Sequence, residues 1–127
     1  MEWGYGSLKK ELLEKCSFNI ENICNIARYD ESTAKKVLLI LLEWACYGQN
    51  EAGIKLGREK ISEIPKKYLK KHLLNTVKHD FDYYDEWNYR RLLELVVELI
   101  PENKDEFIAL NRGMENSELQ EVIDDFA

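Results

Sequence analysis

Apolar residues recur along this chain at spacings of three and four, which place side chains on one face of an α-helix. The clearest stretch predicts a helix over residues 32–47, capped by Ser32 and stopped by Gly48. This helix is apolar almost all round through its middle, so we expect it at the centre of the domain. Its apolar set is Ala34, Val37, Leu38, Leu41, Leu42 and Ala45.

Start and stop signals divide the rest of the chain into further helices. A short helix follows Ser7, and a second follows Ser17; the spacing leaves open whether they are one bent helix. Gly53 and Gly57 weaken the helix over 50–63 but would let a neighbouring helix approach closely. The expected caps and boundaries are Asn50, Pro65, Asp85, Pro101, the capping box Asn103 with Glu106, Gly113, and Ser117 with Gln120.

No stretch alternates between apolar and polar residues as a strand would, so the sequence predicts an all-α fold. Short connections make neighbouring helices antiparallel, and no single pair buries its apolar face alone. We therefore expect one domain, residues 1–127, built as a short HEAT-like stack of helix hairpins. A compact orthogonal helical bundle is the alternative. The expected hairpins are 32–47 with 50–63, 65–79 with 86–99, and 103–112 with 117–126.

Composition supports a folded protein, because 45% of the residues are hydrophobic and 33% are charged. The longest uncharged apolar run, residues 37–42, is far shorter than the roughly 20 residues of a membrane span. The start of the chain lacks the features of a secretory signal, so we expect no membrane association and a cytoplasmic location. Cys16, Cys24 and Cys46 are odd in number, and we expect them to be buried or half-buried reduced thiols.

The formal net charge of −6 is unevenly distributed along the chain. Residues 1–79 hold 14 Lys and Arg against 10 Asp and Glu, a net of +4, whereas residues 80–127 hold 4 against 14, a net of −10. The densest basic cluster is Lys66, Lys67, Lys70 and Lys71. We interpret it as a solvated helix face, because nucleic-acid binding calls for a more basic chain and a recognisable motif.

Residues 80–89 contain five aromatic side chains and four carboxylates. They cannot all be core, because burying unpaired carboxylates is very costly. Aromatic residues beside charges are typical of interface hot spots, and acidic groups would steer a basic partner. Alternatively, this is a loop whose aromatics fold back on the core while Asp85 caps the next helix. The two interpretations are compatible. The candidate partner-binding residues are Asp80, Asp82, Tyr83, Tyr84, Asp85, Glu86 and Trp87.

The sequence gives little support to a metal site or to catalysis. The segment that begins with the carboxylates of residues 80–86 lacks the glycine at position six and the glutamate at position twelve of a calcium loop. His72 and His79 lie seven residues apart near these carboxylates, but no nucleophile or third ligand accompanies them. The glycines fit no phosphate-binding spacing. We therefore expect no enzyme activity, no cofactor and no bound metal.

The stretch Trp87-Asn88-Tyr89-Arg90-Arg91-Leu92-Leu93-Glu94-Leu95, the helical run ending at Pro101 and the closing helix from Glu118 to Ala127 resemble small HEAT-like helical proteins of bacteria, including toxin immunity proteins. The resemblance covers residues 35–127. It implies a cytoplasmic, non-catalytic protein that occupies a toxin's active or binding surface.

Two functions follow as hypotheses. The first is an immunity protein that neutralises a cognate toxin, with a basic domain such as a nuclease as its partner, because many such inhibitors present acid to a basic toxin. The second is a helical-repeat scaffold or adaptor of another pathway. For Arg90 and Arg91 we expect pairing with nearby carboxylates that braces adjacent helices.

Overall fold

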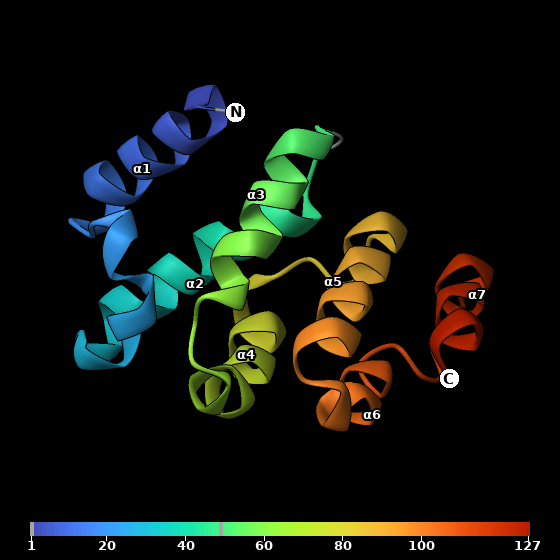
Figure 1. Ribbon diagram of the computed structural model, residues 1–127. Helices are drawn as coiled ribbons and strands as arrows, with labels where there is room; N and C mark the ends of the chain where they lie inside the picture. Colours follow the sequence, from blue (N-terminus) through green and yellow to red (C-terminus); the bar gives the residue numbers. More distant parts are fainter. Residues whose placement is uncertain (1, 49) are drawn as a thin grey trace.

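The computed structural model describes residues 2–48 and 50–127, and every secondary-structure element in these ranges is a helix (Figure 1). The fold is therefore all-α, as the sequence predicts. The elements in chain order are α1 (Glu2–Cys16), η1 (Ile20–Arg28), α2 (Glu31–Cys46), α3 (Glu51–Ser62), α4 (Lys66–Asp80), α5 (Glu86–Leu99), η2 (Pro101–Asn103), α6 (Lys104–Ile108) and α7 (Ser117–Phe126). None of the described helices has the length and apolar character that crossing a membrane requires.

The first two elements are separate helices of different kinds. Ser7 lies inside α1 and does not cap it, and the chain turns at Ser17, whose φ of 51° stops the α-helix. The next element, η1, is a 3₁₀ helix capped by Asn19, which accepts from the Glu21 amide. A 3₁₀ helix repeats every three residues, so Ile20, Ile23 and Ile26 all face the core.

This period corrects the expectation for one of the three thiols. Cys46 is buried and Cys16 is half-buried, but Cys24 is exposed. Cys24 follows the inward-facing Ile23 directly, so in a three-residue repeat it points outward. The expectation that Cys24 is buried or half-buried was therefore wrong.

Short polar side chains fix the start of the later helices. Asn50 caps α3 and Asp85 caps α5, and Pro65 precedes α4, as predicted. Ser32 and Ser117 are not the caps of their helices. Asp30 caps α2 by accepting from the Thr33 amide at 3.0 Å, and Asn116 caps α7. In both cases a carboxylate or amide oxygen just upstream, itself a favoured cap, performs the role.

Two further predicted boundaries differ in detail. Asn103 and Glu106 form a bond between their side chains at 2.7 Å, but Asn103 makes no capping bond to the backbone. The helix that follows is short and ends at Ile108, well before Gly113, which has a φ of 90°. The capping box was therefore wrong, because the 3₁₀ turn η2 runs directly into α6 and leaves no extended cap residue.

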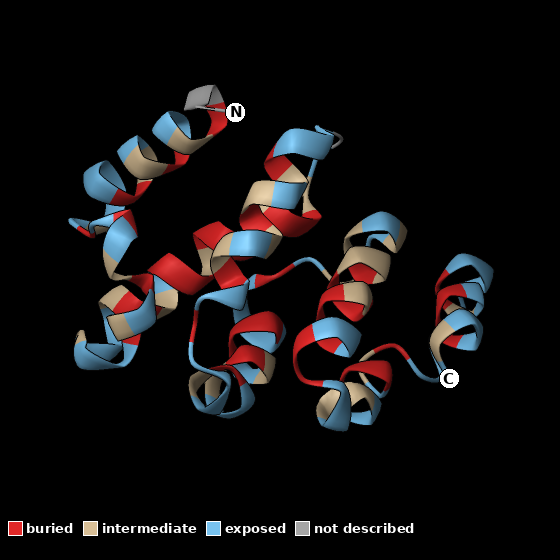
Figure 2. Ribbon diagram, in the orientation of Figure 1, coloured by how far each residue is buried: buried red, intermediate tan, exposed pale blue. Residues whose placement is uncertain are grey.

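Helix α2 is the centre of the domain, as expected from its apolar surface, and it packs against α1, α3, α4 and α5. The closest neighbour is α3, and Gly57 explains the close approach. A Cβ atom at Gly57 would lie 2.6 Å from the backbone nitrogen of Ala45. Buried positions, drawn red in Figure 2, line the sides of the helices that meet at this centre.

The helices α3, α5 and α7 lie side by side in one row (Figure 1). Arg58 of α3 bonds to Glu94 and Glu98 of α5, at 3.2 and 2.9 Å, and Arg90 of α5 bonds to Asp125 of α7 at 2.8 Å. These ties make the row continuous. The prediction that Arg90 braces adjacent helices by pairing with a carboxylate is confirmed.

Helices α3 and α5 of this row run in the same direction. Arg91, near the start of α5, contacts Gly48 just before α3, whereas Glu98, near the end of α5, contacts Arg58 near the end of α3. Parallel neighbours in a row, joined through helices behind them, are the arrangement that a stack of hairpins produces.

The opposite row consists of α2, α4 and the segment η2–α6. Helix α4 packs on α2, and the Lys70 ammonium bonds to Glu102 of η2 at 3.0 Å. The first predicted hairpin, α2 with α3, is tight. In the others the neighbours are shifted, because α5 packs more closely on α2, α6 and α7 than on α4. The stack is therefore staggered rather than built of three equal pairs.

Candidate functional site

The aromatic and acidic segment of the sequence forms the turn between α4 and α5. We define this turn as residues 80–87 and call it the α4–α5 turn. Phe81, in the turn, and Tyr89, in the first turns of α5, are buried in the core, and Tyr83 is half-buried. Tyr84 and Trp87 remain 55% and 59% exposed. The loop interpretation is therefore confirmed for Phe81 and Tyr89, which fold back on the core, while Tyr84 and Trp87 are presented to solvent.

The α4–α5 turn is fixed by hydrogen bonds at several points. The Tyr47 hydroxyl of the α2–α3 connection accepts from the Asp82 amide at 2.8 Å, and its ring packs on Phe81 with centroids 5.1 Å apart. The Asn88 side chain donates to the Asp82 carbonyl at 3.2 Å. Asp82 Oδ1 in turn accepts from the Tyr84 amide at 3.2 Å. Such a turn has little freedom to lose when a partner binds.

A buried amide joins this turn to the last helix. Asn111, which is 0% exposed, donates from Nδ2 to the Tyr83 carbonyl at 2.7 Å. The backbone carbonyl of Asn111 accepts from the Gln120 side chain of α7 at 2.9 Å. The sequence analysis did not identify Asn111 or Gln120 in this role, because nothing local shows that residues so far apart will meet.

Tyr89 anchors the start of α5 from inside. It is 0% exposed, and its hydroxyl donates to the Phe107 carbonyl at 2.8 Å. Burial raises the pKa of Tyr89 to about 12, because the phenolate would lose its hydration there. The backbone beneath Trp87 is thus held by a core contact rather than by surface packing.

The carboxylates of the turn have separate roles. Asp85 Oδ1 accepts from the Asn88 amide at 2.9 Å and caps α5, while Asp80 and Asp82 are exposed. Partial burial raises the pKa of the Glu86 carboxyl, and the neighbouring Glu118 raises it further. The acidic surface therefore continues onto the first turns of α7, which the predicted site did not include.

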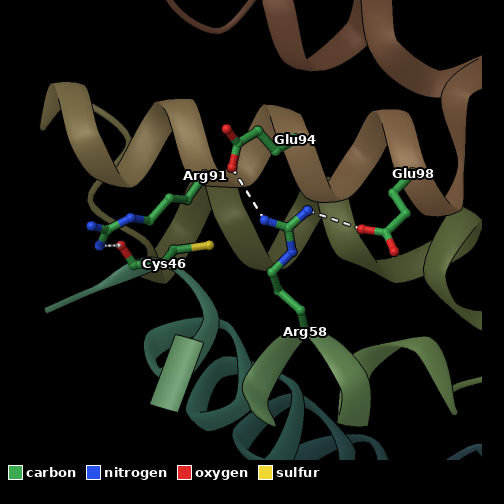
Figure 3. Close-up of polar contacts among 5 residues, drawn as sticks. All are labelled: Cys46, Arg58, Arg91, Glu94 and Glu98. Atoms are coloured by element: carbon green, nitrogen blue, oxygen red, sulfur yellow. Dashed lines mark hydrogen bonds and ion pairs between the residues drawn. The ribbon is translucent and has the colours of Figure 1, made fainter. Parts of the chain in front are cut away.

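Arg91 binds differently from the prediction that it pairs with carboxylates. Its Nη1 donates to the Cys46 carbonyl at 3.1 Å (Figure 3) and also to the Gly48 carbonyl. Helix α2 has no basic residue in its last turn, so Arg91 supplies the positive group that its terminal carbonyls favour. In the same view, the Arg58 guanidinium reaches from α3 to Glu94 and Glu98 of α5.

A pocket of about 380 Å³ opens beside this contact. It lies between the end of α2 and the start of α5. Its lining combines one indole, one amide, two opposite charges and a glycine backbone, from Gly48, Asp85, Trp87, Asn88 and Arg91. The pocket therefore joins part of the predicted turn to Asn88, Arg91 and Gly48, which the predicted set did not contain.

The two histidines have local contacts. His79 Nδ1 lies 2.8 Å from the Asn75 carbonyl, and the His72 ring packs on Tyr68 with centroids 4.4 Å apart. Within residues 2–48 and 50–127, no three His, Cys, Asp or Glu side chains gather closely enough to hold a metal ion. The α4–α5 turn offers exposed aromatic surface, carboxylates and a small polar pocket.

Comparison with known proteins gives no match to a family model, to a curated protein or to a solved structure.

Proposed function

We propose that this chain is a non-catalytic protein-binding protein, and specifically an immunity protein that neutralises a bacterial toxin domain with a basic surface. One observation supports this most strongly. Tyr84 and Trp87 are more than half exposed on a turn that is otherwise fixed to the core. Large aromatic side chains held in solvent on a rigid support are typical of interface anchors.

The charge around these aromatics supports a basic partner. Asp80 and Asp82 are exposed beside them. The acidic surface continues through Glu86 at the start of α5 to Glu118 and Glu121 of α7. A negative surface of this extent raises the association rate with a positive one and disfavours acidic partners. The aromatic residues would then slow dissociation by filling pockets on the partner.

Co-expression tests the proposal most directly. The protein would be produced together with the C-terminal domain encoded by a toxin gene next to its own. We expect restored growth of the intoxicated cells and co-purification of the two proteins. If the domain remains toxic in the presence of the folded protein, the immunity function is wrong. Stable binding without protection would instead support the scaffold or adaptor hypothesis.

Matched variants separate the binding surface from the fold. Tyr84→Ala and Trp87→Ala should abolish or weaken protection while the melting temperature stays near that of the parent. Leu13→Ala is the control, because Leu13 is also 46% exposed but lies on α1, outside the α4–α5 turn. Equal loss of protection in all three variants would show that the effect is not specific to the turn.

A further inference from the structure

The pocket beside Trp87 is lined by two side chains of opposite charge, Asp85 and Arg91, that form no ion pair with each other within the described residues. Asp85 uses Oδ1 to cap α5, and Arg91 uses Nη1 for the two carbonyls at the end of α2. Across the described ranges, the ion pairs within 4.0 Å do not include one between these two side chains. Each side chain therefore keeps hydrogen-bonding atoms beyond these contacts, and both side chains line the pocket.

Arg58, which lines the neighbouring groove, is an arginine whose charge is paired within the protein. Its two terminal nitrogens bond to Glu94 and Glu98, so its charge is balanced within the row of helices. Among the residues that the structure describes, the hydrogen bonds of Arg91 go to two neutral carbonyls through a single nitrogen. A guanidinium has five N–H donors, so several remain to be satisfied by water or by a guest.

We infer that this pocket receives a neutral aromatic side chain with a polar tip, a tyrosine, from the partner protein. A cationic guest would be attracted by Asp85 and repelled by Arg91, and an anionic guest the reverse, so the two side chains together favour neither sign of charge. A tyrosine ring packs against the exposed Trp87 indole, and its hydroxyl both donates and accepts. It can therefore donate to Asp85 and accept from Arg91 or Asn88.

This assignment rests on the proposed function for its biological meaning. It gives the carboxylates and the pocket separate roles in that interface. The exposed carboxylates toward α7 attract a basic surface, whereas the pocket toward α2 takes an uncharged anchor from within it. Tyrosine is among the residues enriched at the centre of protein interfaces, which is consistent with such a role.

The test uses amino-acid probes and so does not need the partner. N-acetyl-tyrosinamide, N-acetyl-phenylalaninamide and N-acetyl-argininamide would be titrated into the ¹⁵N-labelled protein. We expect tyrosinamide to shift the Trp87 indole and Arg91 Nε–H resonances with a dissociation constant on the order of millimolar, as a ligand of its size allows. Phenylalaninamide should bind several-fold more weakly, and argininamide should leave these two resonances in place.

Two variants make the result specific. Asp85→Asn keeps an acceptor oxygen for the cap but removes the charge, so the helix should persist while tyrosinamide binding falls several-fold. Arg58→Gln, in the neighbouring groove, should leave binding unchanged. Stronger binding of argininamide than of tyrosinamide, or no shift with tyrosinamide up to its solubility limit, would overturn the assignment. If tyrosinamide does not bind but the protein still protects cells in co-expression, the immunity proposal stands and the tyrosine assignment is wrong. If tyrosinamide binds but the protein does not protect cells, only the immunity proposal is wrong.

Discussion

The α2–α3 junction and the α4–α5 turn are both corners where two helices meet, but they differ in the room that they leave for side chains. At the first, α3 approaches α2 so closely that a single added Cβ would collide with the backbone of Ala45. At the second, the chain is held by equally specific contacts, yet Trp87 and Tyr84 stay in solvent.

The difference separates side chains that stabilise the fold from side chains that the fold presents. Phe81 and Tyr89 already supply the core contacts of the α4–α5 turn, so stability does not depend on Trp87. A largely exposed indole contributes little to folding, and its role in binding a partner is part of the proposed function. Substitutions at the two corners should therefore differ in their effect on stability.

The largest effect is expected in the centre of α2. Leu41 is 0% exposed, and Leu41→Ala should lower the free energy of unfolding by about 2–5 kcal/mol through lost burial and a residual cavity. Urea titration measures this value. Leu13→Ala is the control, because Leu13 is 46% exposed and its truncation should cost under about 0.5 kcal/mol. A loss below about 1 kcal/mol for Leu41→Ala would mean that α2 is not the core.

A pair of glycines in α3 gives effects of opposite sign. The Cβ of Gly57→Ala would lie 2.6 Å from the Ala45 nitrogen, so the helices must separate at a cost of about 1–3 kcal/mol. The Cβ of Gly53→Ala would lie 3.6 Å from the Trp44 ring, an ordinary contact. That substitution should stabilise the protein by up to about 1 kcal/mol through helix propensity. Equal effects of the two substitutions would contradict the close approach at Gly57.

Alkaline pH should destabilise the protein through two buried groups. Burial raises the pKa of Cys46 from 9.0 to about 12, and that of Tyr89 from 10.0 to about 12. The unfolded chain ionises first, so stability is fully present below pH 9 and falls as the pH rises toward 12. At pH 10 the Cys46 thiol alone should remove up to about 1.4 kcal/mol.

Denaturant unfolding at pH 7, 9, 10 and 11 measures this loss. Cys46→Ala should flatten the fall that begins near pH 9, and Tyr89→Phe should flatten the part above pH 10. The exposed Cys24 provides the comparison, because Cys24→Ala should leave the pH dependence unchanged. The same slope in all four proteins would rule out both buried groups as its cause.

The smallest effect on stability is expected at the α4–α5 turn. Trp87→Ala and Tyr84→Ala remove side chains that are 59% and 55% exposed, and each should change the free energy of unfolding by under about 0.5 kcal/mol. Thermal and urea unfolding check this. A loss above about 1.5 kcal/mol for either variant would place its ring in the core and remove the contrast between the two corners.

Local signals allowed much of the fold to be predicted from the sequence. The caps Asn50 and Asp85 bond to backbone amides two or three residues away, so the residues themselves contain the information. The error at Cys24 arose where the chain adopts a 3₁₀ helix, whose period differs from that of an α-helix by less than one residue.

The tertiary ties of the site could not be predicted in this way. Arg91 was expected to find a carboxylate but binds the end of α2, and Asn111 was not singled out although it connects Tyr83 to α7. These partners lie far apart along the chain, and which side chains meet depends on how the rows of helices are staggered. The exposed aromatics were predictable as a group, but which two of the five remain in solvent was not.

The most direct test of the account is a kinetic binding measurement with a toxin domain that the protein neutralises in co-expression. Trp87→Ala should cost about 2 kcal/mol or more of binding free energy, mainly through faster dissociation. The triple variant Asp82→Asn, Asp85→Asn and Glu86→Gln should slow association and flatten its salt dependence, with Asp105→Asn and Glu106→Gln as the charge control on α6. If all of these variants fold like the parent and bind with unchanged rates, the α4–α5 turn is not the binding surface.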